Sequence, residues 1–236
     1  MTKRLHPSPT VIGLIALWPL LAAGYAQDPP PPKVQIPQPG VPQIMTIEGR
    51  YIRAAYNNEG YAILGYRLAN DSIGQPWILL EVGLALRDKV PDYSITRDRL
   101  SLETPDGKTH ALPTNAEYQN ATLGALLQRE KVQRDSINYF PPNATQGCRI
   151  GFFAELKDRA KAWDQVELTD RRGCMGRLFF PVPGGITHGQ YWLNVKFKDS
   201  LVRVPFRILT KDEDKMLDKN FKSIQKQVED AFKTKG

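Results

Sequence analysis

Few side chains in this 236-residue sequence have the types and the spacing that catalysis or metal binding requires. Beyond the first 26 residues there are two histidines, His110 and His188, and neither has a Glu or a second His at the spacing of a zinc site. The sequence also lacks the H-E-x-x-H, G-x-S-x-G, P-loop and EF-hand patterns. It therefore predicts no metal, no cofactor and none of the common hydrolase mechanisms.

Five carboxylates lie close enough in the sequence that two of them could form a general acid–base pair. They are Glu155, Asp158, Asp164, Glu167 and Asp170. Such a pair needs both groups aimed at one reacting atom, whereas carboxylates in a polar stretch are more often solvated surface charge. An enzyme of unrecognised type is thus the weakest of the functional hypotheses.

Cys148 and Cys174 are the only cysteines, and they could form either a redox-active pair or a structural disulfide. A redox pair usually has the C-x-x-C spacing, which is absent here. Two thiols in an exported chain usually pair, and a bridge closing a loop of about 26 residues stabilises a fold by ~3–4 kcal/mol. We expect a disulfide that ties 148–153 to the start of a strand over 174–182.

A basic surface is predicted on a hairpin formed by 191–197 and 202–208. Apolar residues alternate in both segments, and pairing Phe197 with Val202 brings the two apolar sets together on one face. The other face then holds Lys196 opposite Arg203. Its candidate anion- or partner-binding residues are Trp192, Lys196, Lys198, Arg203 and Arg207. Basic alkyl stems lying over Trp192 in water are the plainer interpretation, and an anionic partner is the functional one.

Pro205 constrains how this hairpin is built. Proline has no N–H for a ladder hydrogen bond, so its nitrogen should point away from 191–197. A four-residue loop over 198–201 satisfies that requirement and keeps the pairing above. We therefore expect 202–208 to be an edge strand or to be locally unpaired at Pro205.

Further strand patterns precede the hairpin and indicate an antiparallel sandwich. Alternating or apolar segments are separated by turn residues and have no helices between them. They cover 44–56, 61–69, 77–86 (a central strand), 100–102 with 108–112, and a short segment around Val166 and Leu168.

The order of an N-D-S-I-G-Q-P loop, an apolar strand, an R-L-S-L-E-T-P-D-G-K hairpin and a later G-R-L-F-F-P-V-P segment resembles the immunoglobulin-like (telokin-like) modules of secreted bacterial proteins. The resemblance covers roughly 61–112 and 176–209 and rests on pattern. It implies an extracytoplasmic immunoglobulin-like β-sandwich over 44–209 and no particular activity.

Two helical segments depart from that plain pattern. Thr114 to Glu117 matches a capping box and begins a helical insertion over 114–137, which either caps the sandwich or forms a lid. Thr210 to Glu213 matches another and begins a C-terminal helix over 210–236. Its apolar stripe, which must bind a partner or pack on the core, consists of Leu217, Phe221, Ile224, Val228 and Phe232.

The N-terminus predicts export. Lys3 and Arg4 precede an apolar run over 11–23, and Gly24-Tyr25-Ala26 fits a cleavage site, so 1–26 is expected to be a signal peptide. An uncleaved anchor is the alternative, and it would be the only membrane attachment. Residues 27–43 hold seven prolines and should form an extended spacer. Loss of Lys3 and Arg4 lowers the formal net charge from +7 to +5, because 1–26 contains no Asp or Glu.

The sequence predicts a periplasmic or extracellular protein and leaves three functions open. The first is a non-catalytic module that binds a protein or an anionic cell-envelope polymer. The second is an assembly subunit that docks through its C-terminal helix, and the third is the unrecognised enzyme. Nucleic acid is not expected as a partner, because the chain is predicted to be exported and has no recognised binding motif.

Overall fold

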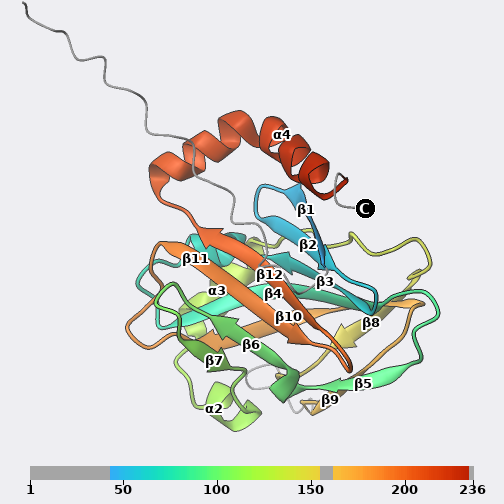
Figure 1. Cartoon of the computed structure of the whole chain (residues 1–236). Helices are drawn as coiled ribbons and strands as arrows, with labels where there is room; N and C mark the ends of the chain where they lie inside the picture. The colour runs from blue at the N-terminus through green and yellow to red at the C-terminus, as the bar shows by residue number, and fades with distance from the viewer. Residues whose placement is uncertain (1–42, 155–161, 234–236) are drawn as a thin grey trace, which may run out of the picture. The chain divides into compact units, whose positions relative to one another are not determined.

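The computed structural model describes residues 43–154 and 162–233, and these form a mainly β fold with a long C-terminal helix (Figure 1). The predicted signal peptide and all of the spacer except Gln43 lie outside the described residues. No helix among those described is both long and apolar enough to cross a membrane.

The larger sheet has six strands in the order β1-β2-β3-β4-β10-β8. Its strands are β1 (Ile44–Gly49), β2 (Ile52–Tyr56), β3 (Gly60–Gly65), β4 (Trp77–Leu86), β10 (Arg172–Pro181) and β8 (Gln146–Ile150). All neighbours are antiparallel except β8 and β10, which are parallel. The apolar segment 77–86 is a central strand, as its composition predicted, with β3 on one side and β10 on the other.

The smaller sheet has four antiparallel strands in the order β12-β11-β6-β7. They are β12 (Leu201–Ile208), β11 (Gly189–Lys196), β6 (Leu100–Glu103) and β7 (Thr109–Ala111). Fully buried side chains of both sheets, such as Leu80 and Phe180 from the larger and Leu193 and Val204 from the smaller, belong to one hydrophobic core. A third, two-stranded sheet pairs β5 (Tyr93–Thr96) with β9 (Gln165–Leu168), and the short 3-10 helix η1 (Arg97–Arg99) follows β5.

The β11–β12 hairpin forms as predicted, but its register differs by two residues. Val195 pairs with Val202, and Lys196 lies opposite Leu201 rather than Arg203. A shift of two keeps every side chain on its own face, so alternation alone could not distinguish the two registers. The loop still has four residues, now 197–200.

The edge position predicted for the strand containing Pro205 is confirmed, because β12 is the outermost strand of its sheet. The side chain of Gln43 bonds the outward peptide groups of Arg203: its Nε2 donates to the Arg203 carbonyl at 2.8 Å, and its Oε1 accepts from the Arg203 N–H at 2.9 Å. Backbone groups two residues apart point the same way. The nitrogen of Pro205 therefore also points away from β11.

Two expectations about helices and strands need correction. The segment 61–69 is not one strand, because β3 ends at Gly65 and a short helix α1 (Arg67–Asn70) follows. The insertion is two helices, α2 (Asn115–Gln119) and α3 (Gly124–Val132). Gly124, which would weaken a helix interior, is instead the first residue of α3. The capping box at Thr114 is present, whereas Val132 is 88% exposed and does not join the apolar face.

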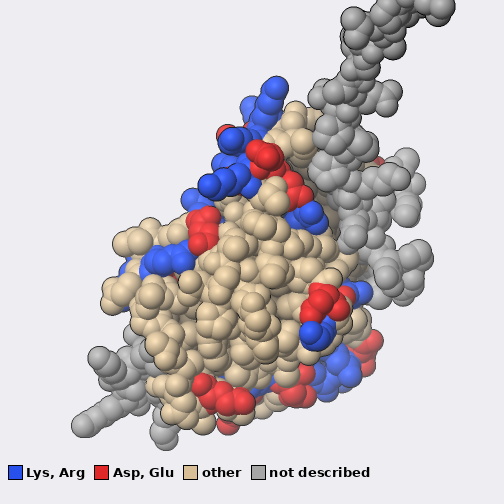
Figure 2. Space-filling model, turned by 90° about the vertical axis from the view of Figure 1, so that its left-hand side faces the viewer, with Lys and Arg blue, Asp and Glu red and all other residues tan. Residues whose placement is uncertain are grey.

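The C-terminal helix α4 (Lys211–Lys233) packs on the edge strand β1 and on the core. Its Thr210–Glu213 capping box forms in both directions. Leu217 and Val228 of the stripe are buried, and Phe221 and Ile224 pack against the core while half-buried; the side chain of Phe232 is not described. Figure 2 shows Lys and Arg side chains, with Asp and Glu side chains among them, at the top of the molecule where α4 lies, above a central area almost free of charge.

The immunoglobulin-like assignment remains a prediction. In constant-type immunoglobulin domains one sheet has the strand order ABED, whereas β1 to β4 adjoin in sequence here. The antiparallel, mainly β class and the C-terminal helix are observed.

Candidate functional site

The predicted basic face of the hairpin is largely neutralised from within the molecule. Nη2 of Arg203 lies 2.6 Å from Oε2 of Glu103, and its Nε donates to Asn194 at 3.0 Å. Its guanidinium lies 4.6 Å from the centroid of the Trp192 ring. Glu103 reaches this face because β6 pairs with β11 and places Glu103 beside Trp192.

Arg207 is held in the same way, since its Nη2 lies 2.6 Å from Oε1 of Glu213 in the first turn of α4. Only Lys196 and Lys198 of the four predicted cations are exposed and make no ion pair with a carboxylate among the described residues. The face therefore offers much less net positive charge than its sequence indicates.

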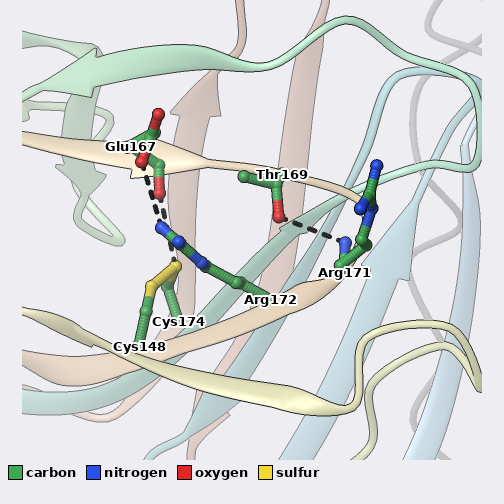
Figure 3. Close-up of a disulfide and its surroundings, with 6 residues drawn as sticks. All are labelled: Cys148, Glu167, Thr169, Arg171, Arg172 and Cys174. Carbon is green, nitrogen blue, oxygen red and sulfur yellow. Dashed lines mark hydrogen bonds and ion pairs between the residues drawn. A yellow bond between two sulfur atoms is a disulfide. The ribbon is translucent and has the colours of Figure 1, made fainter.

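A better candidate is a hollow of about 460 Å³ beside the Cys148–Cys174 disulfide, which we call the disulfide hollow. Strands β8, β9 and β10 supply most of its wall (Figure 3). The lining residues are Gln146, Gly147, Cys148, Arg149, Trp163, Gln165, Val166, Glu167 and Arg172.

The disulfide that the two cysteines predicted is present and joins neighbouring parallel strands. Cys148 of β8 is the register partner of Cys174 of β10, with their Cα atoms 4.2 Å apart. Gly176 allows the approach of the strands, because a Cβ there would collide with the Ile150 carbonyl. Cys174 is buried and Cys148 half-buried, so the bridge forms a rigid part of the wall.

Trp163 provides an aromatic surface at the hollow. Its backbone N–H donates to the carbonyl of Gly151 at 2.7 Å, and its ring lies over the same residue, where a Cβ would come within 3.1 Å of Cε3. The side chain nevertheless remains 49% exposed. A tryptophan ring that is packed on one side and open to solvent on the other is unusual, because so large an apolar group is normally more deeply buried.

Polar side chains with both donors and acceptors line the same hollow. Gln146 and Gln165 bring amides, and Glu167 bonds Arg172 at 3.0 Å across the strands above the disulfide (Figure 3). Binding sites for small molecules combine an apolar surface with a few fixed polar groups in this way. The arrangement suits a ligand with one flat apolar face and hydroxyl groups on its edge.

Of the described carboxylates that were considered for acid–base chemistry, Glu167 alone lines the disulfide hollow. Glu155 and Asp158 lie outside the described residues. Glu167 pairs with Arg172, and Asp170 lies 3.7 Å from Arg171. Asp164 is exposed.

The histidines likewise lie apart, His188 exposed and His110 half-buried with its Nε2 3.4 Å from Thr104 Oγ1. Within the described ranges no three metal-ligating side chains converge.

Sequence reasoning missed a buried charge cluster beneath α3. Glu130 is only 3% exposed and lies 2.8 Å from Arg177 and 3.2 Å from Arg134. Glu81 of β4 accepts a 2.5 Å hydrogen bond from the backbone N–H of Asp135. Burial raises the pKa of the Glu81 carboxyl and of the Asp135 carboxyl. The cluster fastens the insertion to the larger sheet. The cluster could have been found only by knowing that Glu130 is buried, and no sequence pattern predicts that burial.

The fold and the hollow define a disulfide-bonded, mainly β protein with an open hollow beside the disulfide. Comparison with protein-family models, with curated proteins and with solved structures gave no match to this chain.

Proposed function

We propose that this protein is a non-catalytic extracytoplasmic binding module that takes a sugar segment of a cell-envelope polymer into the disulfide hollow. The observation that carries the proposal is the half-exposed ring of Trp163, which lines the same hollow as the amides of Gln146 and Gln165. A sugar ring has an apolar C–H face that suits an indole and hydroxyl groups that suit amides and carboxylates.

Export is part of this proposal. The disulfide is consistent with an oxidising compartment, and residues 1–26 have the features of a signal peptide. Intact-mass measurement of protein purified from the envelope of its source should give a chain that begins at Gln27. A chain that retains Met1 would instead favour the uncleaved anchor.

The assembly-subunit alternative loses its main support. Val228 of α4 is buried in the protein's own core, and Phe221 and Ile224 pack against that core, which leaves less of the stripe available to another subunit.

The test is Trp163→Ala, assayed for cosedimentation with insoluble envelope glycan from the source organism. Loss of a central aromatic contact commonly costs at least ~2 kcal/mol of binding, so the dissociation constant should rise about tenfold or more. Tyr139→Ala is the matched control, because Tyr139 is an exposed aromatic outside the hollow. Equal binding by both variants and the unmodified protein would refute the site.

A further inference from the structure

A line of lysines runs along the outer side of α4. Lys211, Lys215, Lys219, Lys222 and Lys226 follow one another at spacings of four, four, three and four residues, and all five are exposed. At about 100° per residue, these positions fall within a sector of about 80°. We call these five residues the lysine ridge.

The packing of α4 fixes the direction in which the ridge points. The buried Val228 lies on the other side of the helix and belongs to the core, and Phe221 and Ile224 on the same side pack against it. The first turns are held by ion pairs of Arg50 with Asp214 and of Arg207 with Glu213, both at 2.6 Å. The ridge therefore faces solvent, and Figure 2 shows basic side chains, with acidic ones among them, at the top of the molecule where α4 lies.

The charges of the ridge are not neutralised in the way that those of the hairpin are. Arg50, Arg203 and Arg207 each have a carboxylate partner within 3 Å, with N–O distances of 2.6 Å. None of the five lysines makes an ion pair with a carboxylate in the part of the chain that the structure describes. The outer side of α4 therefore carries a row of lysines without carboxylate partners among the described residues.

The shape of the ridge favours binding of a linear anionic chain over binding of a flat anionic surface. From Lys211 to Lys226 it extends about 22 Å, at about 1.5 Å per residue. Exposed carboxylates border it, with Asp218 on one side and Asp212 and Asp230 on the other. A planar anionic surface would meet these carboxylates as well as the lysines, whereas a thin chain would contact the lysines alone.

We propose that the lysine ridge binds an extended polysaccharide that carries carboxylates, lying along α4. Lysine ammonium groups are point charges that suit spaced carboxylates. Single-stranded nucleic acid would call for aromatic side chains on which bases stack, and the ridge has none, since Phe221 lies on the core side. This contact goes beyond the proposed function, because the ridge is separate from the disulfide hollow.

The experiment is affinity electrophoresis in gels that contain polygalacturonate. The test variant changes Lys215, Lys219, Lys222 and Lys226 to Gln. The control changes Lys89, Lys131, Lys196 and Lys198 to Gln, which removes the same charge from exposed positions elsewhere. The test variant should bind about tenfold more weakly or worse, since each exposed charge pair contributes a fraction of a kcal/mol. The control should bind as the unmodified protein does, and added salt should abolish binding.

Two further variants test whether binding depends on positive charge at the ridge and whether it is independent of the disulfide hollow. Arg at the same four ridge positions should keep binding, and Trp163→Ala should leave retardation by polygalacturonate unchanged. Equal losses in the test and control variants would overturn the proposal. So would ridge-dependent binding that is tighter to duplex DNA or to phosphatidylglycerol vesicles than to polygalacturonate.

Discussion

At the scale of single residues, Glu59 joins three parts of the chain. Its carboxylate accepts hydrogen bonds from the Tyr93 hydroxyl at 2.9 Å, the Asp199 N–H at 3.1 Å and the Ser200 hydroxyl at 2.6 Å. Burial by itself would raise the pKa of Glu59, but these hydrogen bonds outweigh it and hold the pKa below the ordinary value. The β11–β12 loop is thereby fastened to the turn between β2 and β3.

Glu59→Gln should lower the free energy of unfolding by about 1–3 kcal/mol at pH 7, because three donors lose a charged acceptor. A carboxyl whose pKa is depressed by folding stabilises the fold above its unfolded pKa of about 4.3. That contribution is lost as the pH falls through the folded value. The difference between the two proteins in urea unfolding should therefore shrink below pH 4.

Glu48→Gln is the control, because Glu48 is half-buried and its carboxylate accepts a hydrogen bond only from the Thr46 hydroxyl among the described residues. It should change the free energy of unfolding by less than about 0.5 kcal/mol. A deficit of Glu59→Gln that stayed constant from pH 7 to pH 3 would contradict the role of the carboxylate.

At the scale of elements, α4 combines two functions on opposite sides of one helix. One side covers the edge strand β1 and completes the core, and the other presents the lysine ridge. The ridge keeps a fixed direction only while the apolar side stays packed.

Phe221→Asp should therefore lower the free energy of unfolding by about 2–3 kcal/mol, because a charge replaces a ring that packs against the core. Ser223→Asp adds the same charge at an exposed position two residues away and should have little effect. Urea unfolding, with hydrogen exchange of the α4 amides, measures both. Equal stability of the two variants would mean that the stripe does not hold the helix.

At the scale of the whole molecule, the disulfide joins the last strand of the larger sheet to its neighbour. Among the described strands β8 pairs with β10 alone, and the bridge spans 26 residues of sequence. It stabilises β8 and with it the wall of the disulfide hollow.

Replacing both Cys148 and Cys174 by Ser should lower the free energy of unfolding by about 3–4 kcal/mol, because the unfolded chain regains the entropy of an open loop. The double replacement leaves no unpaired thiol. Native protein should take up no alkylating reagent until it is reduced, as intact mass can check. Two thiols alkylated without reductant, or unfolding curves that coincide, would show that the bridge is not formed in solution.

The sequence by itself determined the features that depend on neighbours along the chain. The capping boxes at Thr114 and Thr210 join residues three apart, and the strand 77–86 follows from local composition. The disulfide followed because the chain has only two cysteines. In each case the interacting groups are close in sequence or, for the two cysteines, have no other possible partner in the chain.

Only the tertiary structure decided which charges stay free and where a ligand could bind. Arg203 meets Glu103 across 100 residues of sequence because β6 joins β11, and this pairing neutralises part of the basic face predicted for the hairpin. Trp163 becomes a fixed, open surface because its ring settles on Gly151 beside the paired strands β8 and β10. Alternating patterns fix which face a side chain occupies, but they carry no information about which strand lies next to it.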